Sequence, residues 1–195
     1  PVSLDEALRR GIAEDGGLYL PESLPLFEIV DFNNAESIPD VARVLLKPFF
    51  AGSVLESDIE EILEETFSFT IPTRELQVAD KSAALLELYH GPTAAFKDVG
   101  AGFLAACLTR LEGDVDSPLT ILVATSGDTG GAVAAAFDSR AGIRVAVLFP
   151  DGRVSARQEH QLCCWSDNIL SLKVKGSFDD CQLMVKAAMA DKELS

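Results

Sequence analysis

Short apolar runs alternate with helical stretches from about residue 81 onward, and this alternation is the feature that most restricts the fold. The runs are rich in Leu, Ile and Val, and we expect them to form strands at Leu85–Tyr89, Thr120–Ala124, Val145–Phe149 and Ile169–Val174. Helices are expected at Phe96–Arg110, Gly131–Asp138, Ser155–Trp165 and Phe178–Asp191. This pattern predicts an α/β fold, in which βαβ units build a largely parallel sheet flanked by helices.

The first part of the chain is mostly helical in pattern. Ser3-Leu4-Asp5-Glu6 has the spacing of a capping box at the start of a short helix, and Gly11 is placed to close it. Pro39 suits the first turn of a second helix. We expect that helix to run to about Lys47, with Pro48 helping to end it.

A third helix is expected after a second capping-box pattern at residues 57–60. Its apolar stripe consists of Ile59, Ile62, Leu63 and Phe67. The glutamates between these positions are expected to face water. We therefore expect two domains: an accessory helical domain over residues 1–78, and a partial catalytic α/β domain over residues 79–195.

The charge and the cysteines exclude several classes of function. The net charge is −15, from 31 acidic and 16 basic residues, which argues against a nucleic-acid or anionic-membrane surface. No two cysteines form a CxxC pair, so neither a disulfide framework nor a metal site is expected, and the four thiols are expected to pack as small apolar groups. With no signal peptide or membrane-length apolar run, a cytoplasmic location is expected.

Lys97 lies where an amphipathic helix normally has an apolar residue. In the expected helix it shares a face with Ala101, Leu104 and Leu108, whereas Asp98 lies on the opposite side. Burial against an apolar face disfavours the ammonium form, and a neutral amine is what condensation with an aldehyde requires. The alternative is that Lys97 extends from the start of the helix into solvent.

The segment Thr125–Gly131 joins an expected strand to an Ala-rich helix. The unpaired N–H groups and the dipole of a helix N-terminus favour an anion there, and Ser126 and Thr129 add hydroxyl donors. The spacing is not that of a dinucleotide loop or a P-loop, and Asp128 would repel a triphosphate. The segment therefore indicates either a small-anion site or a plain turn.

Of four other residues near these segments, Thr93 has a structural explanation alone, and the other three have both a ligand-binding and a structural explanation. His90 either contacts a ligand or bonds with the backbone of the turn that follows it. Thr93 is well placed to cap the helix that carries Lys97. Arg153 and Ser155 either hold a substrate phosphate at the next helix start, or belong to a turn in which Ser155 with Gln158 caps the helix.

These motifs resemble threonine synthase, a family of fold-type II pyridoxal-phosphate enzymes. The resemblance rests on His90-Gly91-Pro92-Thr93-x-x-Phe96-Lys97-Asp98, followed by Thr125-Ser126-Gly127-Asp128-Thr129-Gly130. It extends to Gly11…Asp15-Gly16-Gly17-Leu18-Tyr19-Leu20-Pro21, and to Gly176-x-Phe178-Asp179-Asp180-Cys181-Gln182. Four motifs in the same order cover nearly the whole chain.

The resemblance implies specific roles for these residues. Lys97 would bind pyridoxal 5'-phosphate through its aldehyde and later carry protons, with His90 and Asp98 in the cofactor site. Residues 126–129, which are Ser126, Gly127, Asp128 and Thr129, would receive the substrate's α-carboxylate. The reaction would convert O-phospho-L-homoserine and water to L-threonine and phosphate. Arg153 and Ser155 are candidates for the substrate phosphate from their own placement.

Members of this family continue well beyond residue 195, so we interpret the chain as an N-terminal portion. The loop that holds the cofactor phosphate would lie in the later sequence. We therefore expect the 195-residue chain alone to bind the cofactor weakly and not to turn over, and to form a homodimer through newly exposed apolar surface. The alternatives are a related phospho-lyase or other fold-type II enzyme, and an inactive binding module.

Overall fold

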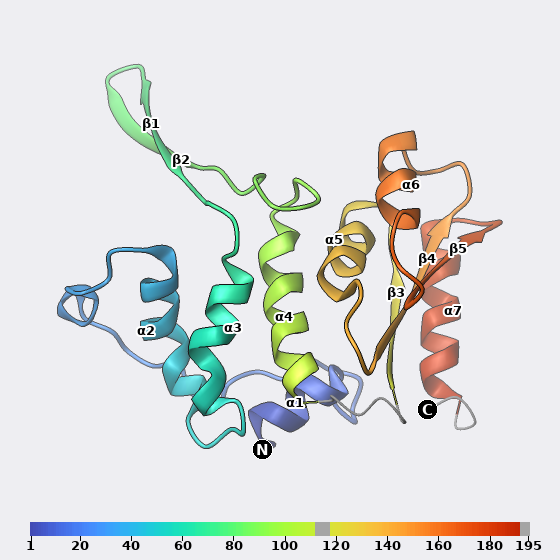
Figure 1. The fold of residues 1–195 in the computed structure, drawn as a ribbon, viewed down its shortest axis with the longest axis horizontal. Helices are drawn as coiled ribbons and strands as arrows, with labels where there is room; N and C mark the ends of the chain where they lie inside the picture. Colours follow the sequence, from blue (N-terminus) through green and yellow to red (C-terminus); the bar gives the residue numbers. More distant parts are fainter. Residues whose placement is uncertain (112–117, 192–195) are drawn as a thin grey trace.

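The structure is a computed structural model that describes residues 1–111 and 118–191. Figure 1 shows α2 (Ile38–Phe50) and α3 (Ile59–Thr66) at one end of the molecule and the parallel strands at the other, with α4 (Lys97–Leu111) between them. A mixed α/β architecture was predicted from the sequence, and it is confirmed. Among the described residues, no helix is both long and apolar enough to cross a membrane.

The N-terminal part contains α1 (Leu4–Arg10), α2 (Ile38–Phe50) and α3 (Ile59–Thr66), with 3-10 turns at Ile29–Phe32 and Glu56–Asp58. The predicted start of α1 is confirmed, since the Ser3 hydroxyl accepts a hydrogen bond from the Glu6 N–H at 3.1 Å. Gly11 closes the helix with a φ of 66°.

Two local predictions in this part are wrong. The second helix continues through Pro48 to Phe50, because Phe50 is only 2% exposed and its burial holds the last turn in place. The capping box expected at residues 57–60 does not form. Ser57 lies in a 3-10 turn, where its hydroxyl donates to Asp58, and α3 begins without a side-chain cap.

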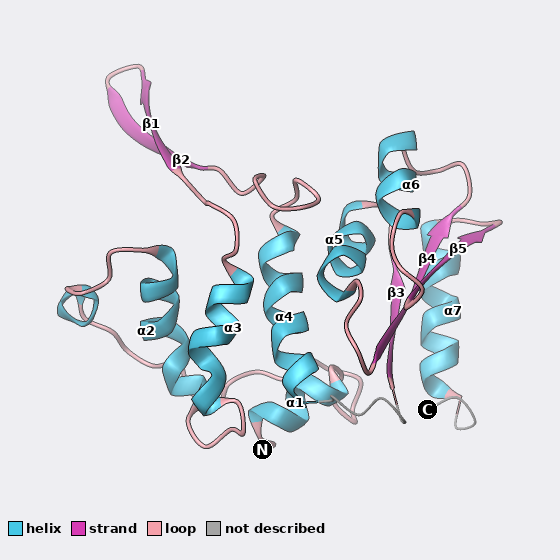
Figure 2. Cartoon of the chain, viewed as in Figure 1, coloured by secondary structure: helices cyan, strands magenta, loops and turns pink. Residues whose placement is uncertain are grey.

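A β-hairpin follows α3, and it extends away from the rest of the molecule (Figure 2). It pairs β1 (Thr73–Val78) with β2 (Lys81–Leu86) in antiparallel register, and all of its residues are exposed. The predicted strand Leu85–Tyr89 in the parallel sheet is therefore wrong. A short apolar run does not specify its partner, and pairing across the turn at residues 79–80 closes a much shorter loop than pairing with a distant strand.

The predicted parallel sheet is confirmed for the other three runs. It consists of β3 (Leu119–Ala124), β4 (Ile143–Pro150) and β5 (Ile169–Val174), in the order β3-β4-β5. The helices are α4 (Lys97–Leu111), α5 (Asp128–Phe137), α6 (Ala156–Cys163) and α7 (Phe178–Ala190). In Figure 1, α5 and α7 lie on opposite sides of the strands. The start of α5 is three residues earlier than expected, so Asp128 belongs to its first turn.

One buried cluster joins the helical part to the sheet. It includes side chains of α2, α3, α4, α5 and β4, among them Phe50, Leu63, Leu108, Phe137 and Phe149. This shared core fixes α4 and α5 against each other and so fixes the loops that precede them.

The cysteines do not all pack as expected. Cys107 and Cys181 are buried, in agreement with packing as small apolar groups, whereas Cys163 and Cys164 are exposed at the end of α6. The reason is that α6 is amphipathic and ends at the surface, so only Leu162 of its last turn faces the core.

Candidate functional site

The two sequence motifs occupy neighbouring loops. One loop spans residues 90–96 and leads into α4, and the other spans residues 125–127 between β3 and α5. A Cβ added at Gly131, in the first turns of α5, would lie 3.9 Å from Thr93 Cγ2. The structure therefore brings the lysine motif and the anion-loop motif side by side.

Lys97 is the first residue of α4 and is partly buried. Its Nζ lies 4.5 Å from the centroid of the Phe96 ring. The side-chain amine of Lys97 forms no hydrogen bond or ion pair with any residue that the structure describes. The expected apolar face is present, since Ala101 and Leu108 are buried and Leu104 is partly buried. Lys97 thus offers an unpaired amine at the start of a buried helix.

The helical pattern predicted that Asp98 lies on the side of α4 opposite the apolar face, but the structure buries it. It is only 4% exposed, and its carboxylate accepts hydrogen bonds from the Thr93 N–H at 3.0 Å, the Ala95 N–H at 3.4 Å and the Thr93 hydroxyl at 2.5 Å. A Cβ at Gly91 would come within 2.5 Å of the same carboxylate. The loop wraps around Asp98, and this buried contact outweighs the helical pattern.

Thr93 is correspondingly not the helix cap that the sequence indicated. It lies in the turn four residues before α4, and its hydroxyl donates to Asp98. The role of Asp98 in cofactor binding stays a prediction. The hydrogen bonds that Asp98 accepts determine the shape of the loop that leads to Lys97.

His90 bonds with a side chain and not with the turn backbone. Its Nε2 lies 2.8 Å from Glu87 Oε2, and its ring stacks on Tyr89 with centroids 4.7 Å apart. Glu87 is 5% exposed, and its other oxygen lies 3.3 Å from Arg74 Nε. The hydrogen bond from His90 holds the pKa of Glu87 below its ordinary value. Sequence reasoning missed Glu87, although an acid within an apolar run was a usable signal.

The anion loop is shaped by Thr125, another residue that the sequence did not single out. Thr125 is 1% exposed, and its Oγ1 accepts from the N–H groups of Gly127 at 3.0 Å and Gly130 at 2.9 Å. The hydroxyls of Ser126 and Thr129 are exposed and bond to no residue within the described ranges. Two hydroxyl donors are therefore available beside the N-terminus of α5.

Asp128 and Gly127 are both in contact with α6. The Gln158 Nε2 donates to Asp128 Oδ1 at 2.9 Å. Gly127 has a φ of 141°, and a Cβ there would come within 2.5 Å of Gln158 Nε2. Glycine is thus required for two reasons, the backbone conformation and the close approach of Gln158.

Ser155 forms the helix cap that was one of its two explanations. Its hydroxyl accepts from the Gln158 N–H at 3.3 Å and donates to Gln158 Oε1 at 2.9 Å. The side chain of Arg153 is exposed and has no hydrogen bond or ion pair in the part of the chain that the structure describes. The phosphate-binding role proposed for these two residues stays a prediction.

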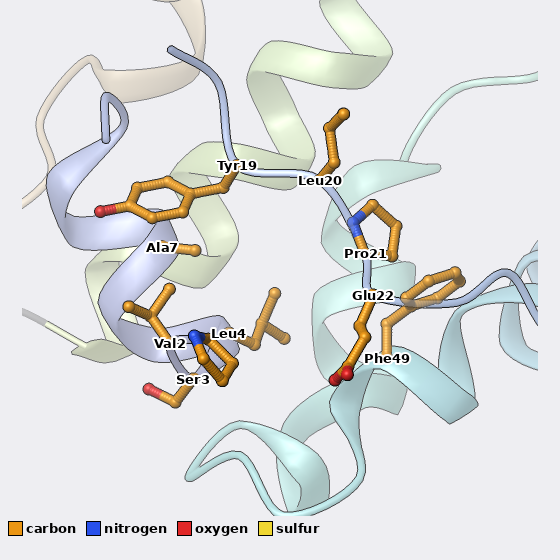
Figure 3. Close-up of a pocket in the computed structure, with 10 residues that line it drawn as sticks. Val2, Ser3, Leu4, Ala7, Tyr19, Leu20, Pro21, Glu22 and Phe49 are labelled. Carbon is orange, nitrogen blue, oxygen red and sulfur yellow. The ribbon is translucent and has the colours of Figure 1, made fainter. Parts of the chain in front are cut away.

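A separate groove lies in the N-terminal part (Figure 3). It is lined by residues 1–4, Ala7, residues 19–22 and Phe49, with no residue from either motif loop. Figure 3 shows Tyr19 and Leu20 on one side and Phe49 on the other.

In the described part of the chain, no group of three or more His, Cys, Asp or Glu side chains could hold a metal ion.

Comparison with known proteins finds two families that match successive parts of the chain. Residues 72–194 match the family described as pyridoxal-phosphate dependent enzyme, and residues 1–67 match the family described as threonine synthase N terminus. The chain is 38% identical to the threonine synthase of Buchnera aphidicola subsp. Baizongia pistaciae, over 99% of this chain and 45% of that relative.

Two solved structures have the same fold. The crystal structure of threonine synthase from Escherichia coli matches with a TM-score of 0.85 and 38% identity, over 99% of this chain and 44% of that one. The structure of PLP bound threonine synthase from Brucella melitensis matches with a TM-score of 0.84 and 38% identity, over 98% of this chain and 42% of that one.

The chain thus spans less than half the length of these relatives, with its two family matches following one another along the sequence. We conclude that the chain belongs to the family of pyridoxal-phosphate dependent enzymes.

Proposed function

We propose that the protein is a threonine synthase, which converts O-phospho-L-homoserine and water to L-threonine and phosphate. The observation that carries the proposal is that the loop leading to Lys97 packs at Thr93 against the start of α5, where the Ser126 and Thr129 hydroxyls are exposed. Within the described residues, the Lys97 amine forms no hydrogen bond or ion pair. The relatives that match the chain are named threonine synthase and support this choice within the family. The small-molecule substrate follows from the same relatives, and its identity is part of the proposal.

The residues present fit pyridoxal phosphate. An aldehyde needs an amine that is not tied up in an ion pair, and Lys97 meets this requirement within the described ranges. The Phe96 ring beside it is 63% exposed and offers an apolar surface next to that amine. When bound, the cofactor supplies an electron-withdrawing ring that stabilises negative charge on the substrate's carbon atoms.

The chain's own residues would bind, orient and transfer protons. Lys97 would hold the cofactor by its aldehyde, and its Nζ would then carry a proton to and from the substrate. The 126–129 loop would bind the α-carboxylate through the N–H groups of Asp128 and Thr129 and the hydroxyls of Ser126 and Thr129. The Asp98-centred loop would set where the lysine lies, and His90, fixed by Glu87, would border the cofactor.

The phosphate of the substrate would meet Arg153, whose guanidinium forms no hydrogen bond or ion pair within the described ranges, near the capped start of α6. Within the proposal, residues 1–78 form an accessory domain and residues 79–195 part of the catalytic domain. Four unpaired cysteines support a cytoplasmic location, where thiols stay reduced. Exposed apolar side chains such as Leu170 and Leu183 support a homodimer.

The test is product analysis with the protein at its full encoded length. We expect L-threonine and phosphate in equal amounts from O-phospho-L-homoserine, and loss of both on Lys97→Ala. Lys47→Ala is the matched control, because Lys47 is exposed on α2 and distant in sequence from both loops. Phosphate release without threonine would identify a related phospho-lyase instead, and unchanged turnover in Lys97→Ala would refute the assignment.

A further inference from the structure

Helix α6 carries two glutamine side chains, three residues apart, that reach the two motif loops. Gln158 Nε2 donates to Asp128 Oδ1 at 2.9 Å, in the first turn of α5. Gln161 Nε2 donates to the Thr93 carbonyl at 3.2 Å, in the loop before Lys97. One helix face therefore contacts both parts of the proposed site.

The amide of Gln158 has a fixed orientation. Its Oε1 accepts from the Ser155 N–H at 3.0 Å and from the Ser155 hydroxyl at 2.9 Å. A flipped amide would place its NH₂ group against the Ser155 N–H and its oxygen against the Asp128 carboxylate, losing these contacts. Only the NH₂ group is left for Asp128, so the capping box of α6 aims a donor at the anion loop.

This donor addresses an electrostatic problem in the loop. Asp128 is an acid in the very segment that is proposed to bind a carboxylate, and two anions at close range repel each other. The hydrogen bond from Gln158 holds the Asp128 carboxylate towards α6. The side chain of Gln158 also lies against Gly127, where a Cβ would come within 2.6 Å of its Cδ.

We propose that Gln158 is a positioning residue for the substrate carboxylate. Its amide holds Asp128 against α6 and thereby leaves the donors of the 126–129 loop free for the substrate. Gln158 acts through Asp128 and is not itself a catalytic residue. The inference rests on the proposed function, because it takes the 126–129 loop as the carboxylate site.

Gln158→Glu and Gln158→Leu separate this contact from the helix cap. A glutamate at position 158 still accepts from the Ser155 N–H, since Ser-x-x-Glu is itself a capping box, but it turns a carboxylate towards Asp128. A leucine removes both contacts. Gln77→Glu is the control for the added charge, because Gln77 is exposed on the hairpin.

The protein at its full encoded length, loaded with pyridoxal phosphate, is assayed with O-phospho-L-homoserine. In Gln158→Leu we expect KM to rise about tenfold or more with little change in kcat, as expected for a lost hydrogen bond to a charged group. In Gln158→Glu the rise should be larger, because the new carboxylate repels Asp128 instead of holding it against α6. Gln77→Glu should match the wild type.

A second measurement does not depend on activity. Urea unfolding of the apo-protein is followed for Gln158→Leu, Asp128→Ala and the double variant, and the cycle gives the coupling between the two side chains. We expect the double variant to be less destabilised than the sum of the single variants. Additive effects would overturn the proposal, because the contact would then hold nothing in place.

The outcomes separate the two proposals. A wild type that forms no threonine refutes the proposed function, while the unfolding cycle still tests the contact. A wild type that forms threonine, together with an unchanged KM in Gln158→Leu or in Gln158→Glu, refutes the role of Gln158 alone.

Discussion

Replacing Gly127 by alanine tests the geometry of the anion loop most directly. Gly127 has a φ of 141°, which a residue with a Cβ rarely adopts. The new methyl group would also lie 2.5 Å from Gln158 Nε2 and 2.6 Å from Gln158 Cδ. The substitution therefore adds backbone strain at one residue and displaces a side chain of another helix.

The two effects have separable magnitudes. The backbone strain costs about 1–3 kcal/mol. The end of the Gln158 side chain is flexible in principle, but it is held by Ser155 and by Asp128, so moving it breaks hydrogen bonds worth about 1 kcal/mol each. We expect Gly127→Ala to lower the free energy of unfolding by about 2–5 kcal/mol in total.

Urea-induced unfolding of the apo-protein measures the change. Gly100→Ala is the matched control. Gly100 lies inside α4, and a Cβ there meets no atom within 4 Å, so this variant should gain about 0.5–1 kcal/mol from helix propensity. In a Gln158→Ala background, Gly127→Ala should cost only its backbone strain. Equal stability of Gly127→Ala and the wild type, or the same cost in both backgrounds, would refute the reasoning.

Two other predictions follow from single side chains. Burial raises the pKa of Cys107 to about 12 and also raises that of Cys181. A thiol reagent at mildly alkaline pH should therefore modify only the adjacent, exposed pair Cys163–Cys164 in the native protein. The reaction time is the time in which all four thiols of the denatured protein react. The Ser37 hydroxyl, aided by Arg43, lowers the pKa of Asp40 to about 2. The stability that this carboxylate contributes is therefore present above its ordinary pKa and is lost as the pH falls towards 2. The difference in Tm between wild type and Asp40→Asn should be constant near neutral pH and should vanish in that acidic range.

Features set by nearby residues could be predicted from the sequence. Ser3 and Ser155 have the spacing of helix caps in the sequence, and each accepts a hydrogen bond from the backbone N–H three residues later. The strand β4 was found because a buried parallel strand is a continuous apolar run, and β3 and β5 were found because short runs rich in Leu, Ile and Val favour strands. The same local reasoning located both motif loops at helix N-termini.

Features set by distant contacts could not be predicted in this way. The apolar run at 85–89 has no mark that distinguishes a hairpin from a buried sheet. Pro48 remains helical because Phe50 is buried by residues far away in the sequence. Gln158 and Gln161 look like ordinary polar residues of a short amphipathic helix, and only the fold shows that they reach residues 30 and 68 positions away.

The difference between Lys97 and Asp98 shows why both kinds of information are needed at this site. The two residues are adjacent, and a helical turn of 100° per residue points them in different directions. Asp98 receives three hydrogen bonds from the loop and is buried, whereas the Lys97 amine bonds to no residue that the structure describes. The hydrogen bonds from the loop to the Asp98 carboxylate fix the first turn of α4. The Lys97 amine takes no part in these hydrogen bonds. Had the two been paired with each other, the amine would be held in an ion pair. The separation of these neighbours is thus what leaves Lys97 available to an aldehyde.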